Sequence, residues 1–336
     1  MRLIALDPAD DTAVDAFVDF ASVVENHDRD VFRNCPVFLR RRLTTVDSEV
    51  DLTVFAAVDA DRVVGALMLQ LPKNENTHIA QAGVAVHPLF RRRGIGTRLM
   101  DKAVELAREH GRGTLVTDAV HPCGETTGIT DTGRPFAKVH GFEPALTMTG
   151  LRVDLDAARA REDALWDSVR RACADYELIS YTCPTPEELV GGVAALSSRV
   201  NSDIPHGDLE VDESTYDVRR VRESEVKESG WGVTKLVTIA RHRGTGRFGG
   251  YSTGRIFASA TDVASVGITL VDPEHRGHRL GLALKIQLHR DLRRSHPTIR
   301  VVETGNANEN EHMLRLNEQL GFAPVGCMTA FQKSVG

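Results

Sequence analysis

The sequence predicts a mixed α/β fold in which one arrangement is built twice in tandem, each copy a central mixed sheet flanked by helices. Two observations lead there: a strand, a basic turn and a helix follow one another in each half, and the elements around that motif recur in the same order. The chain of 336 residues also has room for two domains of about 100–200 residues. Because each repeat is large enough to bury its own core, duplicated domains are expected rather than a solenoid.

The first copy of the motif, residues 86–100, reads VHPLFRRRGIGTRLM. Glycines let the backbone approach a ligand closely. The first amides of a helix have no intrahelical partner, and the helix dipole adds positive potential at that end. We call residues 91–97 the first cradle and expect it to bind a diphosphate through main-chain N–H groups. The alternative is a solvated basic turn.

The second copy, residues 271–285, reads VDPEHRGHRLGLALK. We call residues 276–281 the second cradle. Arg279 stands where the first copy has a glycine, so a Cβ lies where the turn favours none. The alternative here is a domain that keeps the shape of the cradle without binding anything.

The first half is expected to contain alternating strands and helices on both sides of the first cradle. Residues 11–25 and the helix after Ile95 carry apolar side chains at helical spacing. Gly111 and Gly113 suit the end of that helix. The predicted strands are 2–6, 52–58, 62–71, 78–86, 114–120 and 147–155, with further helices near 37–43 and before Gly141.

The second half repeats this order after a charged helix at 157–174. We therefore expect an N-terminal domain at 1–155, a linker helix at 156–175 and a C-terminal domain at 176–336. Thr185, Pro186 and Glu188 form the pattern of a helix start with a capping box. The predicted strands are 176–181, 233–240, 254–260, 263–271 and 299–304, with helices at 186–200, 214–228, after 280 and 306–319.

Composition argues against several classes of protein. The net charge of −6 does not favour nucleic acid or acidic membranes as partners. The N-terminus lacks the pattern of a signal peptide, and no apolar run is long enough to cross a bilayer. Five scattered cysteines without CxxC spacing indicate a reduced, cytoplasmic location. His121 and Cys123 have no matching pair, so no metal is expected.

With these motifs in view, the sequence resembles the GNAT superfamily of acetyl-CoA-dependent N-acyltransferases. The hallmark of that family is a strand, then Gln/Arg-x-x-Gly-x-Gly/Ala, then a helix, with a later Gly-Phe. Arg91, Gly94 and Gly96 match it fully. Arg276 and Gly281 match it in the second copy. The tandem arrangement is similar to that of mycothiol synthase.

The resemblance implies that acetyl-CoA is the cofactor and that its diphosphate and pantetheine bind along both motifs. The implied contacts in the first half are Val84, Ala85, Val86, Arg91, Arg92, Arg93, Gly94, Ile95, Gly96 and Thr97. Those in the second half are Leu270, Val271, Arg276, Gly277, His278, Arg279, Leu280 and Gly281, together with Asn310 and Asn317 of the later helix. A helix cap is the alternative role for Asn310.

The residues that would transfer protons depart from the pattern of the family. In many members of the family a Tyr protonates the leaving thiolate, but that position is Ala137 in the first copy and Asn317 in the second, and neither can act as an acid. The base is often a Glu on the strand before the cradle, and neither strand has one. Glu303 is the candidate catalytic carboxylate, with a salt-bridged strand end as its alternative.

Two main hypotheses of function remain open, besides a more remote one in which the chain is a structural duplicate that acts through protein contacts. The first is an N-acetyltransferase that moves an acetyl group from acetyl-CoA to a primary amine of a small molecule by direct attack, with catalysis in the second half. The second is a non-catalytic acyl-CoA-binding sensor or scaffold with degenerate domains. The expected partners are a small-molecule amine and no nucleic acid or membrane, in a monomer or homodimer. The acidic stretch 203–217 is either a solvated loop or a segment whose negative charge attracts a cationic substrate.

Overall fold

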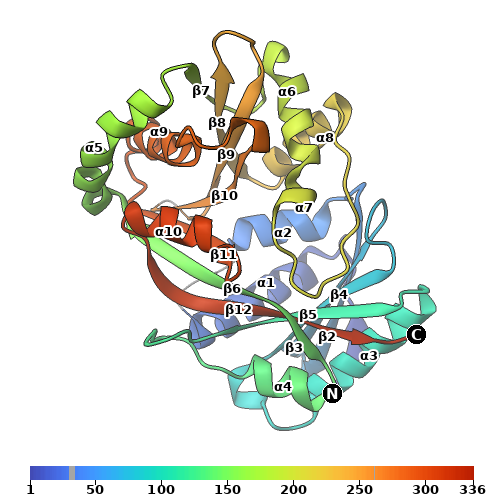
Figure 1. Ribbon diagram of the computed structural model, residues 1–336. Helices are drawn as coiled ribbons and strands as arrows, with labels where there is room; N and C mark the ends of the chain where they lie inside the picture. The colour runs from blue at the N-terminus through green and yellow to red at the C-terminus, as the bar shows by residue number, and fades with distance from the viewer. Residues whose placement is uncertain (30–34, 261) are drawn as a thin grey trace. The chain divides into compact units, whose positions relative to one another are not determined.

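A computed structural model describes residues 1–29, 35–260 and 262–336, and it groups the chain into two compact units (Figure 1). Unit 1 comprises residues 1–149, 206–212 and 325–336. Unit 2 comprises residues 150–205 and 213–324. These units do not follow the predicted boundaries, because the end of the chain belongs with the first half.

Unit 1 contains a mixed sheet in the order β1-β2-β3-β4-β5-β12-β6. Strands β1 to β4 pair antiparallel, β4 pairs parallel with β5, and β5 pairs antiparallel with β12. Its strands are β1 (Arg2–Ala5), β2 (Val50–Asp59), β3 (Arg62–Pro72), β4 (Ile79–Val86), β5 (Thr114–His121), the first part of β6 (Glu143–Asp154) and β12 (Ala323–Ser334). Its helices are α1 (Asp11–Asp28), α2 (Pro36–Thr44), η1 (Pro88–Phe90), α3 (Ile95–Glu109) and α4 (Gly133–Val139).

The last strand of the chain, β12, completes the sheet of unit 1. It pairs with β5 from Cys327 opposite His121 to Ser334 opposite Thr114. Phe331 and Val335 join the core beneath α3. In Figure 1 the red β12 lies beside the teal β5, although most of the sequence separates them. The closing strand of the second half therefore does not close its own sheet.

Helices cover both faces of the unit 1 sheet. The predicted apolar face of α3 is confirmed, because Ile95, Leu99 and Ala103 are buried against one face of the sheet. On the other face, α1 and α2 contribute Phe17, Leu39 and their apolar neighbours to a separate core. The strands that lead to the first cradle are thus held between two packed layers of helices.

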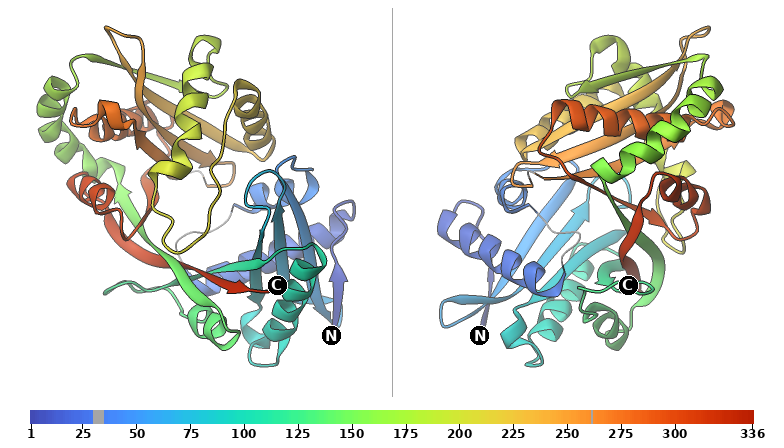
Figure 2. Two further views of the ribbon diagram at one scale, coloured as in Figure 1. Left: turned by 45° about the vertical axis from the view of Figure 1, so that its right-hand side comes forward. Right: turned by 90° about the vertical axis from the view of Figure 1, so that its left-hand side faces the viewer.

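Unit 2 repeats the arrangement, with strands in the order β6-β11-β10-β9-β8-β7. The Leu280, Leu284, Leu288 and Leu292 series of α9 is buried, and α9 lies with α5 on one face of the sheet (Figure 2). The strands are β7 (Tyr176–Thr182), β8 (Val233–His242), β9 (Phe248–Phe257), β10 (Val263–Val271) and β11 (Val301–Ala307). The helices are α5 (Leu155–Ala172), α6 (Glu187–Ser198), α7 (Val200–Asp203), α8 (Val218–Gly230), η2 (Pro273–His275), α9 (Leu280–Ser295) and α10 (Glu311–Gln319).

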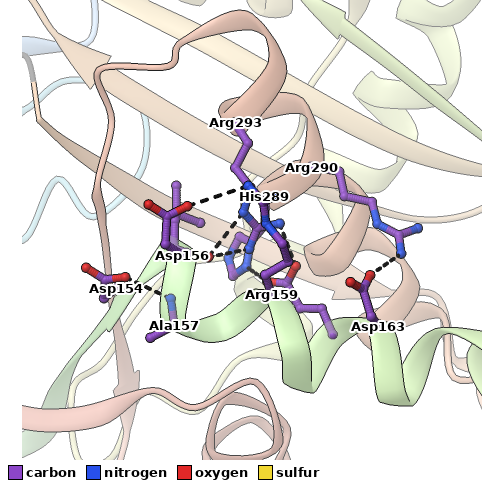
Figure 3. Close-up of polar contacts among 10 residues, drawn as sticks. Asp154, Asp156, Ala157, Arg159, Asp163, His289, Arg290 and Arg293 are labelled. Atoms are coloured by element: carbon purple, nitrogen blue, oxygen red, sulfur yellow. Dashed lines mark hydrogen bonds and ion pairs between the residues drawn. The ribbon is translucent and has the colours of Figure 1, made fainter.

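Helix α5, expected as a linker, is an integral layer of unit 2. Figure 3 shows polar side chains of α5 and α9 facing one another. Glu162 accepts from His289 at 2.7 Å and from Arg293 at 2.7 Å. Burial opposes ionisation of Glu162, but these hydrogen bonds outweigh it and hold the pKa of the carboxyl below its ordinary value. The buried network fixes α5 on α9.

The helix after β7 begins differently from the prediction. The N-cap of α6 is Pro186, which has no side-chain cap, so the predicted capping box is wrong. The Thr185 hydroxyl instead donates to Glu225 of α8 at 2.5 Å, and the Thr185 amide donates to the same oxygen at 2.9 Å. A tertiary partner on α8 has replaced the local cap.

Candidate cofactor and acyl-transfer site

Each unit contains a parallel strand pair that opens toward its cradle. Strand β4 pairs with β5 only from Ile79–Gln81 to Thr114–Val116, while its pairing with β3 continues to Val86. Strand β10 pairs with β11 only through Ser265, which lies opposite Glu303. In both units the parallel pair therefore splays apart on the side of the cradle.

The second splay carries an additional irregularity. The register between β10 and β9 shifts between Val266 and Thr269, as in a β-bulge. A Cβ on Gly267 would lie 2.9 Å from Oγ1 of Thr253, so the backbone approaches its neighbour closely here. The bulge turns main-chain groups of β10 out of the regular ladder just before the second cradle.

The first cradle offers a row of unused amides. Gly94 has φ +76° and is the N-cap of α3 without a side-chain cap, and Arg92 has φ +62°. Within the described part of the chain, no acceptor takes the backbone N–H groups of residues 92–97, and the helical ladder starts with Arg98 N–H donating to Gly94. Open space surrounds the Cβ direction at Gly94. Such a turn suits an anion.

The Arg91 side chain has a different task from the one expected. Its Nη1 and Nη2 donate to the two carboxylate oxygens of Asp28 at 2.8 Å and 2.5 Å, and its Nε donates to the Val86 carbonyl at 3.1 Å. Arg93 donates to Leu89 and lies 5.1 Å from the ring of Phe90. Arg91 thus fastens the turn to α1, whereas Arg92 in the same turn is exposed.

The second cradle adopts the same turn in spite of Arg279. That residue has φ +53° and ψ +25°, the left-handed conformation that Gly94 has in the first cradle. Such a conformation costs a non-glycine residue about 1 kcal/mol. The Arg279 Nη1 donates to Ser168 of α5 at 2.8 Å, which anchors the side chain. Among the described residues, the N–H groups of 277–282 have no acceptor. The Cβ of Arg279 therefore does not prevent the second cradle from adopting the turn, and whether this turn binds an anion stays a prediction.

The last glycine of each motif serves helix packing. A Cβ at Gly96 would lie 3.0 Å from the ring of Phe136 in α4. A Cβ at Gly281 would lie 2.8 Å from Leu316 in α10. The glycines therefore let α4 pack closely against the first cradle and α10 against the second. This packing accounts for a glycine at each position without a ligand.

The asparagines of α10 stabilise the fold. Asn310 is the N-cap of α10, and its side chain accepts from the Met313 amide at 3.2 Å. Asn317 is fully buried, and its Nδ2 donates to Asn306 at 2.6 Å. In this structure both asparagines make contacts within the protein, and their expected contact with the cofactor stays a prediction. Ala137, its counterpart in α4, is buried as well.

Glu303 lies where β10 and β11 part. Its neighbour Val302 belongs to the core beneath α9, so the alternating strand directs Glu303 to the opposite face, which α6 and α8 cover. Its Oε1 accepts from Arg152 Nε at 2.9 Å and from Nη2 at 2.6 Å. Glu303 thus forms the salt bridge that was given as its alternative role. It also lies beside the opening between β10 and β11, where a proton acceptor could serve the reaction.

Unit 1 holds a carboxylate that sequence reasoning missed, Asp118 on β5. Leu115 and Ala119 face the core beneath α3, so Asp118 faces the side of α1 and α2. The residue keeps solvent-accessible surface although protein atoms surround its carboxyl, and no described residue donates a hydrogen bond to that carboxyl. Surrounding protein atoms desolvate the carboxyl and raise its pKa, against a smaller opposing effect of Arg29. An Asp within the apolar run TLVTDAVH was the available signal.

Residues 206–212 of the acidic stretch belong to unit 1. Asp208 N–H donates to Ala145, and Asp212 and Asn76 bond to each other through main-chain and side-chain groups. A cavity of about 360 Å³ lies beside it at the starts of β4 and β5, lined by His78, Glu143, Asp208, Glu210, Gln332 and Lys333. The first cradle follows the end of β4, so this cavity and the first cradle lie at opposite ends of that strand.

Other expectations concern metals and membranes. His121 hydrogen-bonds through Nε2 to Thr329 and through Nδ1 to the Pro122 carbonyl, at 2.9 Å and 2.8 Å. No group of three or more His, Cys, Asp or Glu side chains suited to a metal ion lies in the described ranges. Across the same ranges, no helix combines the length and apolarity that a membrane span requires.

A splayed parallel pair that leads into an amide-rich turn and a helix defines the fold of an acyltransferase of the GNAT type, and comparison agrees. A profile of the Acetyltransferase (GNAT) family matches residues 19–125. A solved tandem GNAT protein from the clavulanic acid biosynthesis pathway is 30% identical with a TM-score of 0.85, over 100% of this chain and 98% of that one. The chain therefore belongs to the GNAT family of acetyltransferases, whose members use acetyl-CoA as acyl donor.

Among individual relatives, mycothiol acetyltransferase of Rothia mucilaginosa (strain DY-18) is 33% identical over 110 residues. That match spans 32% of this chain and only 30% of the relative. A GCN5-related N-acetyltransferase from Sphaerobacter thermophilus has a TM-score of 0.65 at 16% identity, over 99% of this chain and 96% of that one. At that identity the likeness concerns the fold alone.

Proposed function

We propose that this protein transfers an acetyl group from acetyl-CoA to a primary amine of a small molecule by direct attack. The observation that carries the proposal is the pairing, in each unit, of an opened parallel strand pair with a turn of unused amides. Such a turn is suited to a diphosphate, and the opened strands leave main-chain groups free beside it.

The proposed contacts follow the chain of each unit. The N–H groups of 92–97 and 277–282 would hold the diphosphate, with Arg92 adding an exposed positive charge in unit 1. Main-chain groups of Val84–Val86 and of Leu270–Val271 would hold the pantetheine arm. When bound, acetyl-CoA supplies an acetyl group activated as a thioester. The protein's part is to position the amine and to accept its proton.

Glu303 is the proposed proton acceptor in unit 2. Its position at the parting of β10 and β11 favours the role, and its ion pair with Arg152 favours a structural one. Glu303→Gln keeps the shape of the side chain and can still accept from Arg152. If Glu303 accepts the proton, kcat falls by about 100-fold or more with KM for acetyl-CoA unchanged. A kcat within a few-fold of the parent assigns Glu303 to the salt bridge alone.

Binding is tested first, by isothermal titration of the full chain with acetyl-CoA. Gly94→Asp places a negative charge in open space at the first cradle, and Gly277→Asp does so at the second. Each is expected to weaken its own site at least about tenfold, equivalent to about 1.4 kcal/mol. Gly94→Asn and Gly277→Asn are the matched controls, because they add the same bulk and backbone strain without charge. Absence of binding to the parent protein would remove the proposal.

A second candidate function is acyl-CoA binding without chemistry, as in a sensor or scaffold. Two observations favour it. Neither Ala137 nor Asn317 has an acidic side chain, and the carboxylate of Glu303 is already bound by Arg152. Release of free thiol in the presence of a panel of small primary amines separates the two functions. Sustained release supports the transferase. Tight binding of acetyl-CoA with no release above the hydrolysis rate supports the sensor or scaffold.

A further inference from the structure

We propose that Asp118 is the general base of a reaction centre in unit 1, so that the first half of the chain is itself catalytic. The inference rests on the proposed acetyl transfer and names the group that accepts the proton. It changes the expectation that the second half alone performs the chemistry.

The position of Asp118 follows from the strand register. Val116 is the last β5 residue that pairs with β4, and Asp118 comes two residues later on the same face of the strand. Its carboxylate therefore stands beside the opening between β4 and β5. Strand β12 supports the other edge of β5, with Ala330 opposite Asp118. The small Ala330 side chain leaves the carboxylate room on that face.

The end of α1 assembles around the same opening. Asp28, the last residue of α1, is bound by Arg91 of the first cradle. The Asp28 carbonyl also accepts from the Thr130 amide at 2.9 Å. The next residue, Arg29, is close enough to Asp118 to act on its charge. One helix end thus connects the diphosphate turn to the neighbourhood of the carboxylate.

Asp118 is chemically available, in contrast to Glu303. Glu303 accepts two hydrogen bonds from Arg152, whereas the carboxylate of Asp118 is solvent-accessible and accepts no hydrogen bond from a residue in the described ranges. Desolvation raises the pKa of the Asp118 carboxyl, and the positive charge of Arg29 only partly opposes this. A carboxylate that is accessible and has increased proton affinity suits a general base.

The proposed step conserves atoms and charge. A neutral primary amine loses one proton as its nitrogen forms the bond to the acetyl carbon, and an Asp118 carboxylate oxygen accepts that proton. The C–S bond of the thioester breaks, and the electron pair leaves with sulfur as thiolate. The proton on Asp118 then passes to the thiolate, directly or through water, which gives amide, free thiol and the original carboxylate.

Asp118→Asn tests the proposal, since the amide keeps the shape but accepts no proton. We expect kcat to fall by about 100-fold or more, the acidic limb of the kcat/KM profile to disappear, and titration with acetyl-CoA to remain unchanged. Asp101→Asn, an exposed change on α3, is the matched control and should preserve kcat. If Asp118→Asn has the same kcat and the same pH profile as the parent protein, the inference is overturned. The proposed acetyl transfer itself would then still stand.

A measurement without acetyl-CoA gives an independent readout. When folding raises the pKa of a carboxyl, the free energy of unfolding falls as the pH rises through that pKa. Asp118→Asn should therefore have a higher urea midpoint than the parent at pH 7, with the difference shrinking by pH 3. A lower midpoint at pH 7 would indicate a structural carboxylate and contradict the proposal, even if no amine in the panel is turned over. Failure of the parent to bind acetyl-CoA would instead remove the proposed function itself.

Discussion

Single side chains explain why the two cradles have the same backbone turn although their sequences differ. Arg279 adopts the backbone conformation that Gly94 has in the first copy, and its guanidinium is anchored on Ser168. Arg91 stabilises its turn from the other side through Asp28. In both cases an arginine that the motif suggests as an anion ligand binds protein instead, so the anion site consists mainly of backbone N–H groups.

Lys285 yields a prediction at this scale. Its side chain is 1% exposed, its Nζ lies 5.3 Å from the Phe322 ring centroid, and burial lowers its pKa to about 7. Between pH 7 and pH 10.5 the unfolded chain holds a proton that the fold does not, so stability rises with pH in that window. Lys285→Met should therefore unfold with a free energy about 1 kcal/mol or more above the parent at pH 6.

The check on Lys285 is urea unfolding of both proteins at pH 6 and pH 10. The advantage of Lys285→Met should be largest at pH 6 and smaller at pH 10, where less of the protonation penalty remains in the parent. A variant less stable than the parent at pH 6 would show that the ammonium group has a stabilising partner.

At the scale of elements, the cradles are held by the helices packed around them. Helix α1 holds the first cradle through Asp28, and α5 holds the second through Ser168. Helices α4 and α10 pack against Gly96 and Gly281. Affinity for an anion should therefore depend on residues that never contact it.

Asp28→Asn tests this dependence. Loss of the charged partner of Arg91 should loosen the first turn and raise Kd for acetyl-CoA in unit 1 about fivefold, equivalent to about 1 kcal/mol. Titration in a Gly277→Asp background isolates that site. Ser168→Ala should leave it unchanged, because Ser168 anchors only the second cradle. An unaltered Kd in Asp28→Asn would show that the turn holds its shape without α1.

At the scale of the whole molecule, the two halves of the sequence are not the two units of the structure. Strand β12 ends the chain but completes the sheet of unit 1, and residues 206–212 also belong to that unit. Strand β6 begins in unit 1 and ends in unit 2. Neither half of the sequence therefore contains all of one unit.

Removal of residues 325–336 should accordingly destabilise unit 1, although most of that unit lies far away in the sequence. Without β12, the edge of β5 loses its partner from 114 to 121, and Phe331 leaves the core beneath α3. Hydrogen exchange should accelerate at least about tenfold in β5. Strand β10 serves as the internal control and should keep its protection. Faster exchange confined to β10 and β11 would contradict the assignment of β12 to unit 1.

The sequence predicted the order of elements and the location of both turns, because glycine spacing and apolar periodicity are local signals. It did not predict the exchange of β12, since the alternation of Cys327, Thr329 and Phe331 suits an antiparallel neighbour in either sheet. Partner choice between distant strands leaves no local pattern. Asp118 was missed for a related reason, because its role depends on where β5 leaves β4.

The central claim is that the amides of two turns grip a diphosphate, and a crystal structure of the full chain soaked with acetyl-CoA tests it most directly. We predict diphosphate density against the N–H groups of residues 92–97 and 277–282, with pantetheine between the opened strands. Both turns empty at saturating acetyl-CoA, or filled by the protein's own side chains, would contradict the account.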